Sequence, residues 1–323
     1  MKKITAISVF YNRESSVQPS VASLVDQTCD DCEIVLVDDG SQDGTLDALN
    51  RFAGGRVKVR SSPNIGFTRQ LIRTIASTQS EYIAIHGSGD ISLPERFAKQ
   101  SAIMDADASI GVVGSHMIED RGPDCEPVYL RRRVDRDSRK RLLQQNFFAH
   151  GEVMFRRNAY DQVGGYRAFF QYAQDFDLWC RMSRVTGFAN CDDFLYRRSH
   201  QPDGVSFRSK TKLAQVMYCD FAKHCHRAVL DGRPDPLEDI GPAAILLRRR
   251  SRPLGLWMDR QAMKLARVGR QAEAESLIHA SIQYRSGPHA WLSAAVVKFP
   301  SVSKGWLQLK QLLRGRSSSP KAS

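Results

Sequence analysis

Two neighbouring aspartates, Asp38 and Asp39, follow a short apolar run in a position that suits ligand chemistry. They belong to residues 37–45, whose sequence is VDDGSQDGT. A carboxylate at a strand end can accept hydrogen bonds from the imide N–H of uracil or guanine, or from ribose hydroxyls. The same segment also suits an ordinary turn, because Gly40 permits a tight bend and Ser41 can cap a following helix. The spacing alone leaves both interpretations open.

Alternating strands and helices would have to position these aspartates. Apolar runs predict strands at residues 4–9, 33–37, 57–59 and 82–85, and helical spacing predicts helices at 17–25, 46–52 and 67–77. This alternation is typical of an α/β domain with a mostly parallel sheet of βαβ units. In such sheets ligands bind beyond the carboxyl ends of the strands. The polar residues of greatest interest therefore lie at 10–13, 38–41 and 86–90.

The remaining chain predicts more of this domain, followed by an extension of different composition. We expect helices from residue 94 to about 105 and at 175–185, strands at 110–117 and 153–155, and a charged, solvated stretch at 131–141. Beyond Pro234 the sequence is rich in Ala, Leu and Arg and has few acids. We therefore predict an α/β domain at residues 1–235, a basic helical extension at 236–316 and a disordered tail at 317–323.

The net charge of +12 arises entirely at the end of the chain. Residues 1–240 hold 32 acidic and 32 basic side chains, whereas residues 241–323 hold 15 basic and 3 acidic ones. This asymmetry indicates an anionic membrane surface as a partner of residues 245–316, and no motif supports nucleic acid. The alternative is a helical bundle with a solvated basic face. We expect no transmembrane helix, and we expect residues 4–9 to form a strand, not a signal peptide.

Short motifs, taken in their order along the chain, carry a resemblance to a known family. In the first half they are SVFYNR at 8–13, VDDGSQDGT at 37–45, NIG at 64–66 and ISLPERFAKQ at 91–100. In the second half they are HGEVMFR at 150–156, GGY at 164–166, QDFDLWCR at 174–181 and YRRSH at 196–200. Over about residues 4–206 the chain resembles the family 2 glycosyltransferases. The resemblance implies the GT-A fold, a nucleoside-diphosphate sugar as co-substrate, and transfer with inversion at the anomeric carbon.

The resemblance also assigns residues to the sugar donor. It implies donor binding by Phe10, Asn12, Asp38, Asp39, Asn64, Arg69, Ser88 and Asp90. Within this set Asp39 would face the base. Arg69 would offset the diphosphate charge, because the fork of guanidinium donors matches phosphate oxygens. For Arg69 the alternative is an exposed helix arginine without a ligand.

Inversion in one step needs a carboxylate that takes the proton from the acceptor hydroxyl as it attacks. The resemblance implies that Asp175 is this base. From the residues alone, Asp175 also suits the cap of the helix that carries Trp179. We expect Asp177 and Trp179 to be structural. Candidate neighbours of the donor or of a metal are His86, His150 and His200, with a structural role as the alternative for each.

The chain departs from the family pattern after its fourth expected strand. The family has Asp-x-Asp there, which holds Mg²⁺ or Mn²⁺ against the diphosphate, whereas this chain has Gly87 and Gly89. Divalent cations of this kind need oxygen ligands, and only Asp90 remains. Asp90 could bind a metal with a histidine, Arg69 and backbone N–H groups could replace the metal, or catalysis could be lost. The presence of the Gln174–Asp175 pair favours an active enzyme.

The sequence therefore predicts an inverting glycosyltransferase that acts on a glycan or lipid-linked acceptor in cell-surface polysaccharide synthesis. We expect it in the cytoplasm, peripheral on the inner membrane. One rival prediction is a catalytically inactive sugar-nucleotide-binding or scaffolding protein of the same fold. Another is a membrane or polyanion adaptor that functions mainly through its basic extension. We expect the acceptor to meet residues 121–146 and the extension, the least patterned stretches.

Overall fold

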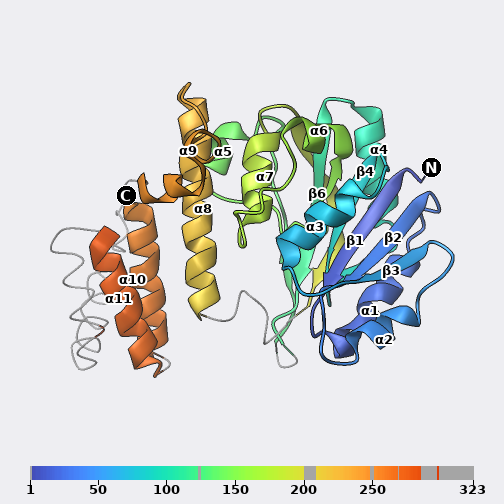
Figure 1. Ribbon diagram of the computed structural model, residues 1–323, viewed down its shortest axis with the longest axis horizontal. Helices are drawn as coiled ribbons and strands as arrows, with labels where there is room; N and C mark the ends of the chain where they lie inside the picture. The colour runs from blue at the N-terminus through green and yellow to red at the C-terminus, as the bar shows by residue number, and fades with distance from the viewer. Residues whose placement is uncertain are drawn as a thin grey trace, which may run out of the picture. The chain divides into compact units, whose positions relative to one another are not determined.

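The computed structural model describes residues 2–122, 125–199, 209–247, 251–267, 269–284 and 297. His200 and the expected tail at 317–323 lie outside the described residues. The chain divides into two compact units, one of Met1–Gly204 with Phe221–Pro242 and one of Val205–Asp220 with Ala243–Ser323 (Figure 1). The first unit contains the whole sheet, and the second contains helices of the basic extension.

The first half of the sheet is parallel, as the sequence predicted. Its strands lie in the order β3-β2-β1-β4, with bounds β1 (Ile4–Phe10), β2 (Cys32–Asp38), β3 (Val57–Ser61) and β4 (Tyr82–Gly87). Ile4 of β1 pairs with Cys32 of β2 and with Tyr82 of β4, so these three strands start level. Their carboxyl ends therefore meet at one edge, where Phe10 pairs with Asp38.

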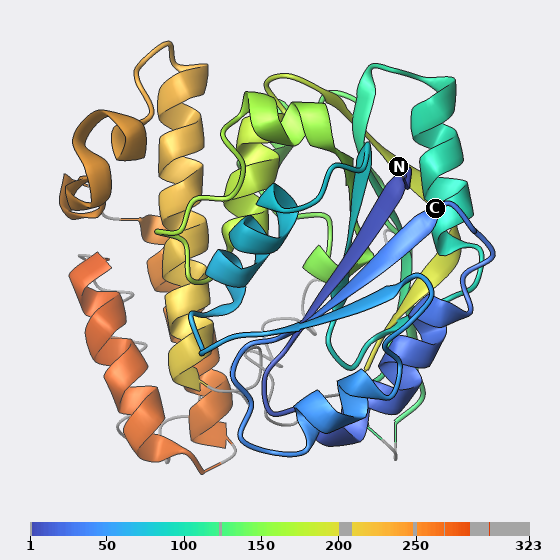
Figure 2. The same cartoon turned by 45° about the vertical axis from the view of Figure 1, so that its right-hand side comes forward.

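Helices cover both faces of this parallel half (Figure 2). One face carries α1 (Glu14–Val25), α2 (Thr45–Asn50) and α4 (Arg96–Ala106), and the other carries α3 (Phe67–Ala76). Successive side chains of β1 point to opposite faces, so Ile4, Ala6 and Phe10 join α1, α2 and α4 in one hydrophobic cluster. All seven residues of β1 are buried, and five of them are apolar, which is typical of a central strand that is covered on both faces. The start of the chain is thus the buried strand that we expected.

The second half of the sheet is mixed. Its strands are β5 (Ile91–Ser92), β6 (Ile110–Glu119), β7 (Val128–Leu130), β8 (Met154–Arg156) and β9 (Gly187–Arg198). β8 joins the halves by pairing antiparallel with both β4 and β6, and β9 runs parallel to β6. The sequence analysis missed β9, because its exposed Asp192 and Asp193 and its register shifts against β6 hide any simple alternation. The predicted α/β class is confirmed.

Short helices follow the strands of this second half. They are α5 (Arg139–Leu142), the 3-10 helix η1 (His150–Glu152), α6 (Arg157–Gln162) and α7 (Gln174–Met182). Trp179 in α7 is completely buried, as expected of a core residue. The end of α8 (Ser209–Leu230), from residue 221, and α9 (Pro236–Ile240) also belong to the first unit.

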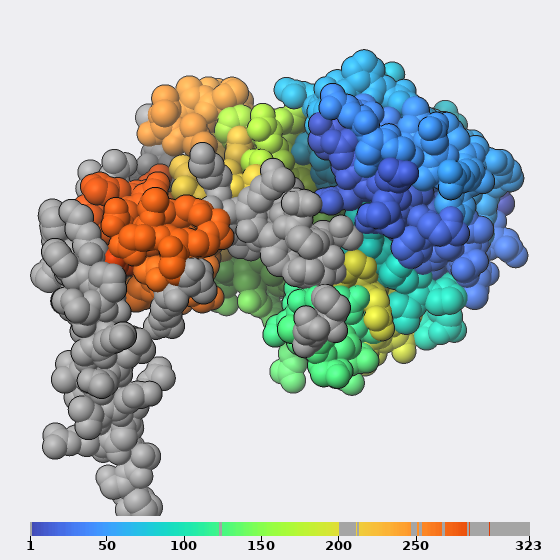
Figure 3. All heavy atoms as spheres, turned by 90° about the horizontal axis from the view of Figure 1, so that it is seen from below, coloured from blue at the N-terminus to red at the C-terminus, as the bar shows by residue number. Residues whose placement is uncertain are grey.

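The second unit is helical in its described part. It contains the start of α8, most of η2 (Gly241–Leu247), α10 (Arg252–Arg267) and α11 (Gln271–Tyr284). Helices α10 and α11 pack against each other around the side chains of Leu254, Met258, Ala262, Ala274, Leu277 and Ile278. In the space-filling view their atoms form one orange body (Figure 3). In the part of the chain that is described, every helix is too short or too polar to cross a membrane.

Candidate active site

Asp39, just beyond β2, holds the loop that precedes α3. Its carboxylate accepts hydrogen bonds from two N–H groups of the 64–66 loop (2.9 and 3.1 Å) and from Gln70 Nε2 (2.7 Å). The residue is only 3% exposed. Gly40 has a left-handed backbone (φ +73°) and lies so close that a Cβ there would be 2.6 Å from the Asn64 nitrogen. The structure thus brings Asp39 and Asn64 together at one edge of the sheet.

Asn12 and Asp38 tie together the loops that follow β1 and β2. Asn12 has a left-handed backbone (φ 50°), its Oδ1 accepts from Gln42 N at 2.8 Å, and its N–H donates to Ser41 Oγ at 3.0 Å. Asp38 accepts from Ser41 N at 3.2 Å and from Ser61 Oγ at 2.9 Å. Both side chains therefore fix the shape of the sheet edge at which Asp39 lies.

At the end of β1 the exposed aromatic residue is Tyr11, not Phe10. Phe10 is completely buried in the core, whereas Tyr11 is 47% exposed. The Asp39 N–H donates to the Phe10 carbonyl at 2.8 Å, so Tyr11 follows directly at the Asp39 edge. The sequence analysis named Phe10 and missed Tyr11. The available signal was an aromatic residue placed one position beyond a buried strand.

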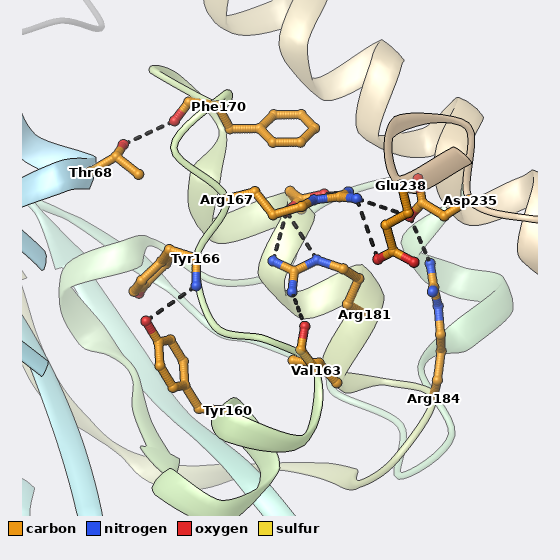
Figure 4. Close-up of polar contacts among 11 residues, drawn as sticks. Thr68, Tyr160, Val163, Tyr166, Arg167, Phe170, Arg181, Arg184, Asp235 and Glu238 are labelled. Carbon is orange, nitrogen blue, oxygen red and sulfur yellow. Dashed lines mark hydrogen bonds and ion pairs between the residues drawn. The ribbon is translucent and has the colours of Figure 1, made fainter. Parts of the chain in front are cut away.

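The first turn of α3 reaches from this edge to His150. The Phe67 ring meets the His150 ring edge-on, with centroids 5.6 Å apart. Thr68 Oγ1 donates to the Phe170 carbonyl at 2.9 Å (Figure 4). Arg69 lies on the exposed outer face of the helix, whereas its neighbour Thr68 is buried. The contacts of α3 with the rest of the site therefore come from Phe67 and Thr68.

The turn after β4 directs the Asp90 side chain inward. Asp90 Oδ2 accepts a hydrogen bond from the Tyr196 hydroxyl at 2.5 Å, and Oδ1 accepts one from Ser199 N at 3.0 Å. A Cβ at Gly87 would lie 2.3 Å from Asp90 Oδ2. Burial raises the pKa of Asp90 to about 6, although both hydrogen bonds act in the opposite direction. The carboxyl is therefore mostly ionised at pH 7.

His86 is a buried residue that supports this turn. Its Nδ1 lies 3.0 Å from Ser92 Oγ, and its Nε2 lies 3.0 Å from Ser20 Oγ. Burial, together with a nearby guanidinium, lowers the pKa of His86 to about 3, so the ring is neutral. Gly89 has a left-handed backbone (φ 95°) and donates its N–H to Ser20 Oγ at 3.1 Å. Ser88, between them in the turn, is half-buried.

The side chains of this turn do not fit the Mg²⁺ or Mn²⁺ site that the resemblance implies. Both ring nitrogens of His86 and both carboxylate oxygens of Asp90 are engaged in hydrogen bonds. Gly87 and Gly89 supply no side-chain oxygen, and such cations need several oxygen ligands. Across the described residues, no three His, Cys, Asp or Glu side chains lie close enough together to hold a metal ion.

Asp175 lies in the first turn of α7 and is only partly buried. Asn146 Nδ2 donates to Asp175 Oδ2 at 3.0 Å, and Asn146 is itself oriented because its Oδ1 accepts from Phe148 N at 3.2 Å. No residue in the described ranges donates a hydrogen bond to Asp175 Oδ1. The helix begins after the left-handed Ala173 (φ 57°) and no side chain caps it. The capping role that the sequence left open is therefore absent.

His150 lies between α3 and the start of α7. Its Nε2 is 2.6 Å from the Tyr166 hydroxyl, and its Nδ1 is 3.3 Å from Gln174 Nε2. Both ring nitrogens of His150 therefore have a polar neighbour. Burial lowers the pKa of His150, while the carboxylate of Asp175 acts to raise it. His150 is therefore neutral at pH 7.

Gly151 links the two aspartates of the site. A Cβ at Gly151 would lie 2.0 Å from the Tyr196 hydroxyl, the group that donates to Asp90. The preceding His150 contacts Gln174, the neighbour of Asp175. A short chain of contacts therefore links Asp90 to Asp175, which is distant in the sequence.

A buried ion network supports the helix that carries Asp175 (Figure 4). Asp177 is 1% exposed and pairs with both Arg167 and Arg181, the latter through Nη2 at 2.8 Å. Arg167 also reaches Asp235 at 3.1 Å. Burial acts to raise the pKa of Asp235, but Arg167 lowers it overall. Asp177 therefore has the structural role that the sequence predicted, and it fixes the start of α7.

Comparison with known sequences gives consistent matches. A model of the family described as glycosyl transferase family 2 matches residues 5–164. The amylovoran biosynthesis glycosyltransferase AmsE of Erwinia amylovora is 30% identical over 204 residues, which are 61% of this chain and 76% of AmsE. EpsE of Bacillus subtilis, assigned as a glycosyltransferase, is 28% identical over 65% of this chain and 77% of its own length. The chain spans only 22% of the Pasteurella multocida chondroitin synthase, to which it is 25% identical.

Comparison with solved structures gives the same fold. The mannosyltransferase PcManGT of Pyrobaculum calidifontis, in complex with GDP-Man and Mn²⁺, has a TM-score of 0.54 at 18% identity and covers 96% of this chain and 84% of its own. S. aureus TarS 1-349 in complex with UDP has a TM-score of 0.55 at 15% identity, covering 94% of this chain and 92% of its own. In a longer TarS structure the match covers 88% of this chain but only 49% of the TarS chain.

Proposed function

The chain belongs to glycosyl transferase family 2, and on that premise we propose the transfer that this glycosyltransferase catalyses. It moves a sugar from a nucleoside-diphosphate donor to a hydroxyl of a glycan or lipid-linked acceptor, with inversion at the anomeric carbon. Solved structures of the same fold are described with GDP-Man, UDP and UDP-GlcNAc, which supports a nucleotide-sugar donor. AmsE is named for amylovoran biosynthesis, which supports a role in polysaccharide synthesis.

Asp175 is the proposed general base. The observation that carries this assignment is its carboxylate in the first turn of α7, with Oδ2 oriented by Asn146 and Oδ1 receiving no hydrogen bond from the described residues. In the reaction the acceptor hydroxyl passes its proton to this carboxylate as its oxygen bonds to the anomeric carbon. The bond from that carbon to the diphosphate breaks at the same time, and the nucleoside diphosphate leaves with the electron pair.

Neighbouring residues support Asp175 in this role without competing for the proton. Asn146 occupies one carboxylate oxygen, so the other is left for the acceptor hydroxyl. His150 is held neutral by burial and is already hydrogen-bonded to Tyr166 and Gln174. Its proposed part is to keep Gln174, and with it the start of α7, in position.

The nucleoside of the donor is proposed to lie at the edge formed by Tyr11, Asn12 and Asn64. Tyr11 offers an exposed aromatic face for stacking on a base. A carboxylate has about four lone-pair positions, and three hydrogen bonds to Asp39 leave one that suits an imide N–H. Ser88 and Arg69 remain the candidates for contact with the diphosphate.

An anionic membrane surface is the proposed site of action, reached through residues 245–316, and we propose a cytoplasmic location. In the described part of this range Leu256, Arg260 and Lys264 recur every four residues on α10 and are exposed. Basic and apolar residues on one helix face suit a bilayer interface. Sedimentation with anionic and zwitterionic vesicles tests this. Binding to anionic vesicles should be lost in Arg260→Glu/Lys264→Glu, and unchanged binding would contradict the proposal.

The proposed reaction is tested by a thermal-shift panel of UDP-, GDP- and dTDP-sugars, followed by Asp175→Asn. We expect one donor class to raise the melting temperature of the wild type and of the variant alike. We expect Asp175→Asn to lose the release of nucleoside diphosphate from that donor, and Asp161→Asn, an exposed acid, to retain it. Retained turnover in Asp175→Asn would contradict the base assignment. The absence of any donor shift with folded protein would favour the scaffolding alternative.

A further inference from the structure

The Asp90 carboxylate occupies the space in which a side chain at residue 87 would begin. A Cβ on Gly87 would lie 2.3 Å from Asp90 Oδ2 and 3.0 Å from the Tyr196 hydroxyl. The same hydroxyl accepts a hydrogen bond from Gly87 N at 3.0 Å. An aspartate at residue 87 and the observed position of Asp90 therefore exclude each other. The loss of the first aspartate of the family motif and the inward position of Asp90 are two parts of one change.

The site that receives Asp90 is built around it. Tyr196 is completely buried, and its hydroxyl donates to Asp90 while Ser199 N donates to the other oxygen. Gly151 makes room for the hydroxyl, because a Cβ there would lie 2.0 Å from it. The Asp90 main chain is also fixed, since its N–H donates to the Gly87 carbonyl at 3.0 Å. The carboxylate is thus held on its inner side by hydrogen bonds from β9 and the segment just after it.

A buried cation, Arg96, lies near the Tyr196 ring on the inner side of this site. Arg96 is completely buried, and its guanidinium bonds to the Ile85 carbonyl (2.8 Å) and Ser92 Oγ (2.8 Å), neither of which carries charge. The guanidinium carbon lies 5.0 Å from the centre of the Tyr196 ring, whose hydroxyl leads to Asp90. A buried charge without a counter-charge is strongly destabilising. Asp90 is therefore part of the charge balance of the core.

Glu152 is a second buried acid near Arg96. Burial lowers the pKa of Arg96, and the charge of Glu152 opposes this more than the charge of Asp90 does. Glu152 is completely buried, and one of its carboxylate oxygens has no hydrogen-bond partner among the described residues. Burial raises the pKa of Glu152 to about 7, so it is only partly ionised at neutral pH. Asp90 and Glu152 therefore both contribute to the charge balance around Arg96.

We infer that Asp90 is a structural residue and not a metal ligand, and that this protein binds the donor diphosphate without a divalent cation held by the turn after β4. The inference rests on the proposed function, since it concerns the same donor site. It also explains why His86 is directed into the core, where Ser20 and Ser92 engage both ring nitrogens.

The first experiment measures the dissociation constant of the donor class found in the panel, in EDTA and in MnCl₂, by calorimetry. We expect the two values to agree within about threefold, a difference well under 1.4 kcal/mol. Binding that is more than about tenfold weaker in EDTA would overturn the inference while leaving the proposed function intact. A folded protein that binds no donor in either buffer would overturn the proposed function and, with it, this inference.

The second experiment compares Asp90→Asn with Asp26→Asn, an exposed aspartate on the same unit. We expect Asp90→Asn to lower the melting temperature and to leave the donor dissociation constant within about threefold, and Asp26→Asn to change neither. A large loss of donor affinity at an unchanged melting temperature would overturn the inference.

A third experiment uses the wild type alone, so it remains informative if Asp90→Asn does not fold. Electron paramagnetic resonance measures how much of the added Mn²⁺ binds to the protein in the absence of donor. No stoichiometric binding of Mn²⁺ is expected, because the described residues offer no cluster of ligands. Binding of one equivalent of Mn²⁺ that Mg²⁺ displaces would overturn the inference.

Discussion

Asp90 and Asp175 are linked by a short chain of contacts but have opposite surroundings. Asp90 follows a strand of the parallel sheet, accepts hydrogen bonds at both oxygens and has its pKa raised by burial to about 6. Asp175 lies in the first turn of a helix, is partly exposed, and receives a hydrogen bond from Asn146 and from no other residue that the structure describes. The partners of Asp90 satisfy the carboxylate, whereas the partner of Asp175 only orients it. A carboxylate of the second kind can take a proton from a substrate.

The comparison shows that an aspartate near a family motif need not inherit the function of that motif. Asp90 lies next to the two positions where the family has its metal-binding acids, yet its side chain fills the space left by Gly87 and faces a core that contains Arg96. Asp175 is partly exposed, and Asn146 donates a hydrogen bond to one of its two carboxylate oxygens. Hydrogen-bond partners, and not position in the sequence, distinguish the two.

The largest expected effect is a loss of stability when the ion network under α7, the helix that carries Asp175, is broken. Asp177→Asn removes the charge that Arg167 and Arg181 share, and breaking a buried pair costs about 3–5 kcal/mol. Urea unfolding should show this loss, and the exposed Asp161→Asn should show almost none. A loss below about 1 kcal/mol would mean that the start of α7 is not held by this network.

A variant at Gly151, which lies between the surroundings of Asp90 and those of Asp175, should destabilise the protein through its contact with Tyr196. Gly151→Ala places a methyl group 2.0 Å from the Tyr196 hydroxyl, and overpacking of this kind costs about 1–3 kcal/mol. The double variant Gly151→Ala/Tyr196→Phe lacks that hydroxyl and should recover part of the stability lost in Gly151→Ala. Strictly additive losses in urea unfolding would contradict the contact.

The orientation of Asp175 gives a smaller effect on catalysis. Asn146→Ala removes one hydrogen bond to a carboxylate, which is worth about 1.5–3 kcal/mol. We expect kcat for nucleoside diphosphate release to fall by at least about tenfold, while KM for the donor changes little. Asn146→Gln serves as the matched control and should recover part of the rate. A rise in KM at unchanged kcat would place Asn146 in donor binding instead.

The smallest effect concerns the pH dependence of stability. Asp90 has a pKa of about 6 in the folded protein against the ordinary 3.8, so the folded state binds a proton more tightly than the unfolded state. Stability from this group is therefore lost as the pH rises through about 4 to 6 and gained as it falls. The other titrating groups are shared with Asp90→Asn, so the difference in free energy of unfolding between the two proteins isolates Asp90. On going from pH 7 to pH 5, the wild type should gain about 1 kcal/mol of stability relative to the variant. A difference that does not change with pH would contradict the burial of this carboxylate.

The sequence predicted the parallel half of the sheet because buried strands and amphipathic helices leave local patterns. It also predicted the structural role of Asp177 and the burial of Trp179. It missed the partners that decide the chemistry, since Asn146 meets Asp175 across 29 positions and Tyr196 meets Asp90 across 106. Such contacts depend on the tertiary fold and leave no periodic signal. Tyr11 was missed for a related reason, because exposure at a strand end depends on where the strand stops.

The most direct test of the account compares Asp175→Asn and Asp90→Asn in one assay, with EDTA present. The measured quantity is the rate of nucleoside diphosphate release from a saturating donor, per mole of folded protein. The account predicts that Asp175→Asn loses about 10²–10⁴-fold in rate at an unchanged melting temperature. It predicts that Asp90→Asn melts earlier but keeps a rate close to that of the wild type. The opposite pattern, with Asp90→Asn inactive and Asp175→Asn active, would contradict the account.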